Sequence, residues 1–156
     1  MLKIILSTAC LAALAIGPAA SALTAEQKVY KLVEKTNALG QVSTSRTSAE
    51  LVTPGEKIVY VLAYTNDKIE PANDIVLTMP IPSDVTYMEG SAETETAKLE
   101  YSAGDGFSAR DDLMVIGDDG AMRTARAEEL THVRWTVIAA VAPGQSGELS
   151  FKAALK

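Results

Sequence analysis

The chain has 156 residues and carries 14 basic and 20 acidic side chains, for a net charge of −6 at pH 7. Lys3 is the one charged residue among the first 22, so residues 23–156 hold 13 basic and 20 acidic side chains, a net charge of −7. Such an acidic domain is repelled by phosphate backbones and by anionic lipid, which argues against nucleic-acid binding and against electrostatic docking on a membrane.

The first 22 residues have the organisation of a secretory signal peptide. A positive start is followed by an uncharged apolar run over residues 4–16, a Gly-Pro break and the small residues Ala-Ser-Ala at 20–22. A membrane-spanning helix is the alternative, but the end of this stretch is weakly hydrophobic and contains proline. We therefore expect a helical signal peptide over residues 1–22 and no stable membrane insertion after its cleavage. The expected destination is the periplasm, the cell surface or the extracellular space.

Cys10 raises the alternative of a lipid anchor. The apolar run continues past Cys10 to Ile16, and no leucine stands three residues before the cysteine, so cleavage there is disfavoured. Once residues 1–22 are removed, no cysteine remains, and stability must come from packing and hydrogen bonds rather than from disulfides. Residues 23–156 are enough for one domain with a packed core.

Short stretches of β-branched and aromatic residues, separated by turn residues, begin in the first half of this domain. Residues 24–36 are ambiguous, because they fit both a capped helix and a first strand. Residues 56–65 are apolar on both faces and lie between two turns, which predicts a central strand. Residues 74–79 and 85–89 are predicted as two further strands.

The second half alternates more clearly. Residues 131–137 place Trp135 on the same face as two valines, so we expect Trp135 in the core rather than on a sugar-binding surface. Residues 147–156 alternate in the same way after a Pro-Gly turn. Residues 98–102 are predicted as a strand, and residues 113–116 and 121–124 as a hairpin.

Several motifs occur in a characteristic order: VTPGEKIVY at 52–60, YTN at 64–66, NDIVL at 73–77, IPSDVTY at 81–87, VRWT at 133–136 and APGQSG at 142–147. Over residues 28–156 the chain resembles the bacterial and archaeal surface repeat domain catalogued as domain of unknown function eleven. The resemblance implies an immunoglobulin-like antiparallel β-sandwich of about seven to nine strands in an envelope or secreted protein. It favours a strand for residues 24–36 and implies no catalytic residues. The family has an aspartate two residues before the Leu-Pro pair that ends its second core strand, whereas this sequence has TMPIP at residues 78–82. The segment over residues 101–131 is also longer than the corresponding part of the family.

No pattern in the sequence fits a catalytic or zinc site. His132 is the one histidine and lies on the outward face of its predicted strand, and a single histidine without cysteine cannot supply a zinc site. We therefore expect a non-enzymatic protein without a cofactor. Calcium is the alternative ligand, because acidic residues crowd one segment, although they form no EF-hand pattern. The candidate calcium ligands are Asp105, Asp111, Asp112, Asp118 and Asp119.

Two classes of function remain. The first is a structural, adhesive or protein-interaction module of the envelope, including a fibre subunit that adds strands through residues 147–156 or through the N-terminal segment. Lys152 and Lys156 argue against strand addition at residues 147–156, since lysines on an edge strand often prevent its pairing with another chain. The second is a periplasmic or secreted binding module for polysaccharide or calcium, with Tyr87, Tyr101 and Phe107 as candidate exposed aromatics. Residues 105–129 are not explained by the fold, and we expect function there first.

Overall fold

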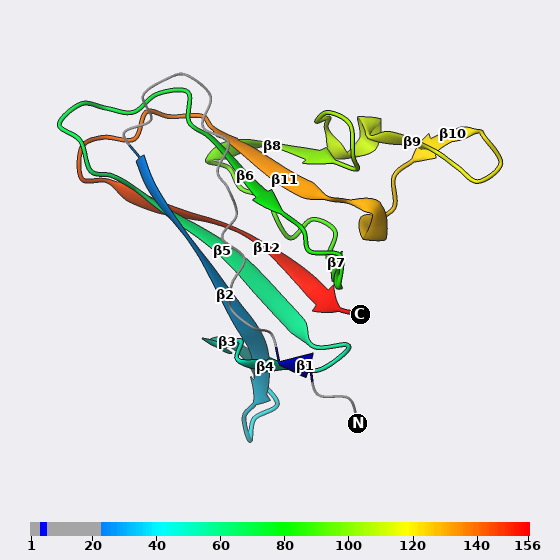
Figure 1. The fold of residues 1–156 in the computed structure, drawn as a ribbon. Helices are drawn as coiled ribbons and strands as arrows, with labels where there is room; N and C mark the ends of the chain where they lie inside the picture. The colour runs from blue at the N-terminus through cyan, green and yellow to red at the C-terminus, as the bar shows by residue number, and fades with distance from the viewer. Residues whose placement is uncertain (1–3, 6–22) are drawn as a thin grey trace.

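The structure, a computed structural model, describes residues 4–5 and 23–156, and the regular secondary structure of these residues is antiparallel β apart from two 3-10 turns (Figure 1). The predicted signal peptide and its cleavage site lie outside the described residues, apart from the two-residue strand β1 (Ile4–Ile5), which pairs with β4 (Leu51–Val52). Within the described ranges, no helix is long and apolar enough to cross a membrane.

Five strands form the larger sheet, in the order β3-β2-β5-β12-β7. The central strand β5 (Lys57–Asn66) pairs along one side with β2 (Leu23–Thr36) and along the other with β12 (Ser146–Leu155). The short strand β7 (Val85–Tyr87) covers only the last residues of β12, and β3 (Val42–Ser48) pairs with the second half of β2. The strand that the resemblance favours for residues 24–36 is present as β2, which pairs with β5 over Leu23–Lys31 and with β3 over Tyr30–Thr36.

Three strands form the smaller sheet, in the order β6-β11-β8. The middle strand β11 (His132–Val137) is antiparallel to β6 (Val76–Pro80) and to β8 (Ala97–Ser102). The predicted strands at 74–79, 98–102 and 131–137 are confirmed to within two residues at their ends. The all-β prediction is therefore correct for the described chain.

One hydrophobic core joins the two sheets. Alternate residues of β5 and β12 meet alternate residues of β6, β8 and β11 in a single buried cluster. Trp135 and Phe151 are fully buried at its centre, and Phe151 stacks on Tyr60 with ring centroids 4.9 Å apart. The indole Nε1 of Trp135 donates to the Ala92 carbonyl at 3.1 Å, which satisfies its one polar atom. The prediction that Trp135 is a core residue is confirmed.

Strand β3 is an element that the sequence analysis missed. The pairing of β2 with β5 ends at Lys31, whereas its pairing with β3 continues to Thr36, so this hairpin runs beyond the central strand. Every residue of β3 is exposed, and its sequence VSTSRTS lacks the alternation of apolar side chains by which a half-buried strand is recognised. Its closing turn depends on Asn37, whose Oδ1 accepts hydrogen bonds from the N–H groups of Leu39 and Gln41.

Candidate functional site

The segment between β8 and β11 belongs to neither the five-stranded nor the three-stranded sheet. It contains the 3-10 helices η1 (Arg110–Asp112) and η2 (Ala127–Glu129), and between them the hairpin of β9 (Met114–Ile116) and β10 (Met122–Thr124). Figure 1 shows this hairpin projecting away from the two sheets. We call residues 103–130 the arm. The predicted hairpin is confirmed.

The base of the arm is fixed to the core. Leu113, Ala125 and Leu130 are buried in the same cluster as Trp135. The N–H of Ala125 donates to the carbonyl of Leu113 at 2.8 Å, so the two ends of the hairpin are joined where they leave the core. The two ends of the arm's hairpin are thus packed into the core of the domain.

The tip of the hairpin is shaped by turn residues. The N–H of Gly117 donates to the Ala121 carbonyl at 2.8 Å, and Gly120 has a φ of 79°, a left-handed conformation that favours glycine. Asp119 accepts a hydrogen bond from the Ala121 N–H through its Oδ1 at 3.0 Å. Asp119 therefore acts as a turn residue in this structure.

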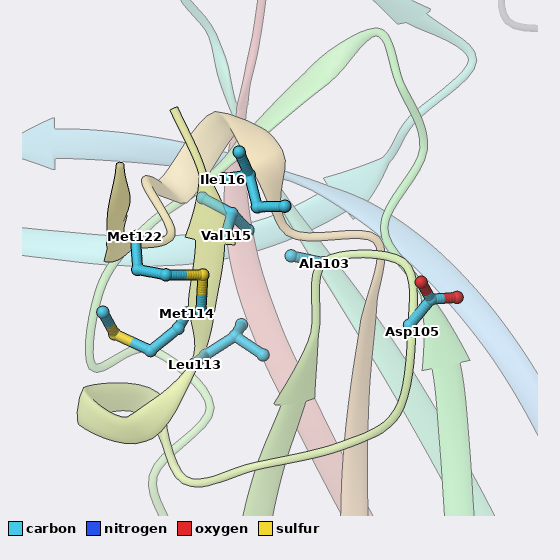
Figure 2. A pocket seen from close by; sticks show the side chains of 7 residues that line it. All are labelled: Ala103, Asp105, Leu113, Met114, Val115, Ile116 and Met122. Carbon is cyan, nitrogen blue, oxygen red and sulfur yellow. The ribbon is translucent and has the colours of Figure 1, made fainter. Parts of the chain in front are cut away.

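One face of the hairpin is apolar and exposed. Met114, Ile116 and Met122 lie on this face and are 44%, 73% and 62% exposed, whereas Val115 is directed toward the core. Together with Leu113 and Val115 at the base of the hairpin and with two residues of the preceding loop, they line a groove with a volume of about 400 Å³, shown in Figure 2: Ala103, Asp105, Leu113, Met114, Val115, Ile116 and Met122. Methionine is flexible and polarisable, and an exposed apolar patch of this kind is typical of an interaction surface.

The arm carries an excess of negative charge that is not neutralised within residues 23–156. Each of its arginines is paired with glutamate: Arg110 with Glu89, Arg123 with Glu129, and Arg126 with Glu128 and Glu129. Hydrogen bonds from Arg123 hold the pKa of the Glu129 carboxyl well below its ordinary value. The remaining acidic side chains of the arm have no ion-pair partner in the described chain: Asp105, Asp111, Asp112, Asp118 and Asp119.

The structure does not bring the predicted calcium ligands together. Asp105 lines the groove, Asp111 and Asp112 lie in η1, and Asp118 and Asp119 lie in the hairpin turn. No group of three or more His, Cys, Asp or Glu side chains within the described residues could hold a metal ion. The geometry of the arm thus offers scattered acidic groups rather than a coordination shell.

A second cluster lies on the outer face of the smaller sheet. Arg134 donates to the Glu100 carboxylate at 2.9 Å, and its Cζ lies 3.9 Å from the centre of the Phe107 ring. The hydrogen bonds from Arg134 lower the pKa of Glu100. Phe107 meets His132 edge to face at 6.3 Å, and the His132 Nδ1 lies 3.1 Å from the Thr131 hydroxyl. No carboxylate within residues 23–156 is hydrogen-bonded to or ion-paired with this imidazole. The cluster packs Phe107, which lies in the loop before η1, against Arg134 and His132 of β11.

Two of the three aromatics expected at the surface are buried. Tyr87 and Tyr101 are 2% and 4% exposed, and their hydroxyl oxygens lie 2.9 Å apart. The expectation that they form a sugar-binding surface is wrong, because both side chains are on the core-facing side of their strands. Phe107 is half-buried under the Arg134 guanidinium.

The two strands expected to add further copies have different surroundings. The N-terminal strand β2 is flanked by both β3 and β5 only at Tyr30 and Lys31, and its first residues, Leu23–Val29, pair with β5 alone, so their other edge is open among the described strands. Strand β12 is covered over Ala153–Leu155 by β7, and the backbone of Lys152 is bonded to Met88 and Ser91. Beside the second half of β2, from Tyr30 to Thr36, the outermost strand of the larger sheet is β3.

Comparisons with protein-family models, with curated proteins and with solved structures find no match to this chain.

Proposed function

We propose that this protein is an exported, non-enzymatic module of the cell envelope that binds another protein through the groove on the β9–β10 hairpin. The observation that carries this proposal is the exposure of Met114, Ile116 and Met122 on an element whose base is anchored in the core. Single exposed apolar residues are common on protein surfaces, whereas several that lie together on one face are typical of an interaction site. Export rests on the signal-peptide pattern of residues 1–22.

The proposed scaffold is an immunoglobulin-like sandwich with altered connectivity. Strands β2-β5-β12-β7 face β6-β11-β8 across the core, which is the four-and-three division of the constant-type immunoglobulin fold. The order along the chain differs, however. Strand β8, the fifth of these seven strands, lies where the immunoglobulin fold has its last strand, G, and the last strand, β12, lies where that fold has its fifth strand, E. This arrangement is compatible with the proposed family resemblance and leaves the connection from β8 to β11 free to carry the arm.

A polysaccharide or calcium ligand has less support than a protein. Sugar sites use exposed aromatic rings, and Tyr87 and Tyr101 are buried. The aspartates of the arm are spread over two turns and a loop instead of converging on one point. Exposed methionine and isoleucine side chains are the chemistry of a peptide or protein contact.

Selection of peptides from a random display library against the exported protein tests this proposal. We expect enriched peptides to bind the native protein and to lose at least about tenfold in affinity with Ile116→Asp, because a charge would enter the apolar groove. Ile69→Asp is the matched control, since Ile69 is 93% exposed and lies outside the groove. The absence of any enriched peptide, or equal binding to the Ile116→Asp variant, would overturn the proposal.

Self-assembly by strand addition is a second candidate, favoured by β3. The hydrogen bond from the Asn37 N–H to the Gln41 carbonyl fixes the ladder, so the backbone groups of Val42, Thr44, Arg46 and Ser48 point away from β2. Thr44→Pro removes one outward N–H and leaves the β2–β3 bonds in place. If β3 joins copies, light scattering after size exclusion will detect oligomers that Thr44→Pro converts to monomers. A monomer at all concentrations would exclude this candidate.

A further inference from the structure

The first observation is the open edge of β9. The hydrogen bonds from Gly117 to Ala121 and from Ala125 to Leu113 fix the register of the hairpin. In that register, the backbone N–H and C=O groups of Met114 and Ile116 point away from β10. Strand β9 has β10 as its one paired neighbour among the described strands. The backbone groups of Met114 and Ile116 are therefore available to hydrogen-bond with an added strand.

The groove lies along this open edge. Figure 2 shows Met122 to one side of β9 and Ala103 and Asp105 to the other, and all three line the same groove. An added strand would lie between β9 and the loop that carries Ala103 and Asp105. Its alternate side chains would then meet the exposed side chains of Met114 and Ile116.

The second observation is the charge at the two ends of this edge. Asp111 and Asp112 precede β9, and Asp118 and Asp119 follow it, while Asp105 lines the groove itself. None of these carboxylates has a cationic partner in the described chain, whereas the arginines of the arm are all paired. Three residues of a strand span about 10 Å, so the acidic pairs flank a site of about five residues.

We infer that the groove takes an extended basic segment of a partner protein, which adds to β9 as a strand. The segment has apolar side chains at alternate central positions and lysine or arginine at both ends. Apolar contacts with Met114 and Ile116 hold its centre, and the flanking aspartates attract its ends. This inference rests on the proposed function of the groove, and it adds the charge, the conformation and the backbone pairing of the occupant.

Synthetic peptides test the charge of the occupant. Lys-Lys-Val-Thr-Val-Lys-Lys and Glu-Glu-Val-Thr-Val-Glu-Glu have the same apolar pattern and opposite charge. We expect the basic peptide to bind the exported protein at least about tenfold more tightly at low salt, and more weakly as salt rises. The pair Asp111→Asn and Asp118→Asn should weaken binding of the basic peptide, and Glu50→Gln with Glu70→Gln, two exposed acidic positions outside the groove, should not.

N-methylated peptides test strand addition without any change to the protein. In a strand, alternate N–H groups point toward the neighbour, so N-methylation of one alternate set should abolish binding and N-methylation of the other should not. Equal effects of the two sets would overturn strand addition.

The library selection separates this inference from the function on which it rests. Enrichment of neutral or acidic peptides that depend on Ile116 would support the groove as a binding site and overturn the basic occupant. Enrichment of basic peptides that depend on Ile116 would support both. Recovery of no peptide would overturn both.

Discussion

The ring of Tyr64 fills the space that a side chain at Gly147 would occupy. The two residues are direct partners in the ladder between β5 and β12, and a Cβ built on Gly147 would lie 2.5 Å from the Tyr64 Cζ. Real Cβ atoms do not approach so closely, and Tyr64 is buried, so its ring has little room to move. A glycine inside a strand normally weakens it, and here the facing aromatic ring explains the residue.

Gly147→Ala should therefore lower the free energy of unfolding by about 1–3 kcal/mol, the usual cost of forcing an extra carbon into a packed core. Urea unfolding, followed by the fluorescence of the buried Trp135, measures this change. In a Tyr64→Ala background the same substitution should cost little or be stabilising, because the obstructing ring is absent. An equal cost in both backgrounds would contradict the steric explanation.

Tyr87 and Tyr101 make a second testable pair. Their hydroxyl oxygens lie 2.9 Å apart in the core, and the Tyr87 hydroxyl also accepts the N–H of Ala92 at 3.3 Å. Tyr101→Phe removes one hydrogen bond and should cost about 1 kcal/mol of unfolding free energy. Tyr87→Phe should cost more, because it leaves both the Tyr101 hydroxyl and the Ala92 N–H without this partner. The two variants are compared by urea unfolding, and the reverse order would contradict the assigned network.

The strands of the core could be predicted because their signal is local. Residues 131–137 alternate in sequence because alternate side chains of β11 face the core, and β5 is apolar throughout because Val59 and Val61 are buried on the face opposite Tyr60. The turns before β5 and β12 carry Pro-Gly pairs, whose conformational preferences are properties of the residues themselves.

The features that could not be predicted depend on contacts between distant segments. Strand β3 has no apolar pattern and is ordered by its ladder with β2. Tyr87 and Tyr101 are ordinary strand tyrosines in sequence, and only the meeting of β7 with β8 across the core hides them. The acidity of residues 105–129 is visible in the sequence, and the proposed groove lies in this segment. Its groove, however, results from Ala103 and Asp105 lying beside β9, which no local pattern encodes.

Alkaline pH should unfold the protein through its buried tyrosines. Burial raises the pKa of Tyr60 to about 12, against 10 for a solvated tyrosine, and also raises the pKa of Tyr101. The unfolded chain then releases these protons first, so stability is fully present below pH 10 and is lost as pH rises toward 12. The expected slope is about 1.4 kcal/mol per pH unit for each such tyrosine. Urea unfolding at pH 9, 10 and 11 measures it, and Tyr60→Phe should reduce the slope; a pH-independent stability would contradict this account.

Peroxide should distinguish the methionines of the groove from the methionine of the core. Met114 and Met122 are 44% and 62% exposed, whereas Met79 is fully buried. Oxidation of an exposed thioether to the polar sulfoxide requires no unfolding, so both groove methionines should gain oxygen well before Met79, as measured by peptide mass spectrometry.

The oxidised groove should also lose affinity for the basic peptide, because a sulfoxide is a poorer apolar contact than a thioether. The double variant Met114→Leu, Met122→Leu should retain binding after the same treatment, since leucine keeps the apolar surface and cannot be oxidised by peroxide. If oxidation of Met114 and Met122 left peptide binding unchanged in the native protein, the apolar face of the hairpin would not be the contact surface. The strand edge of β9 would then act through its backbone and its flanking aspartates alone.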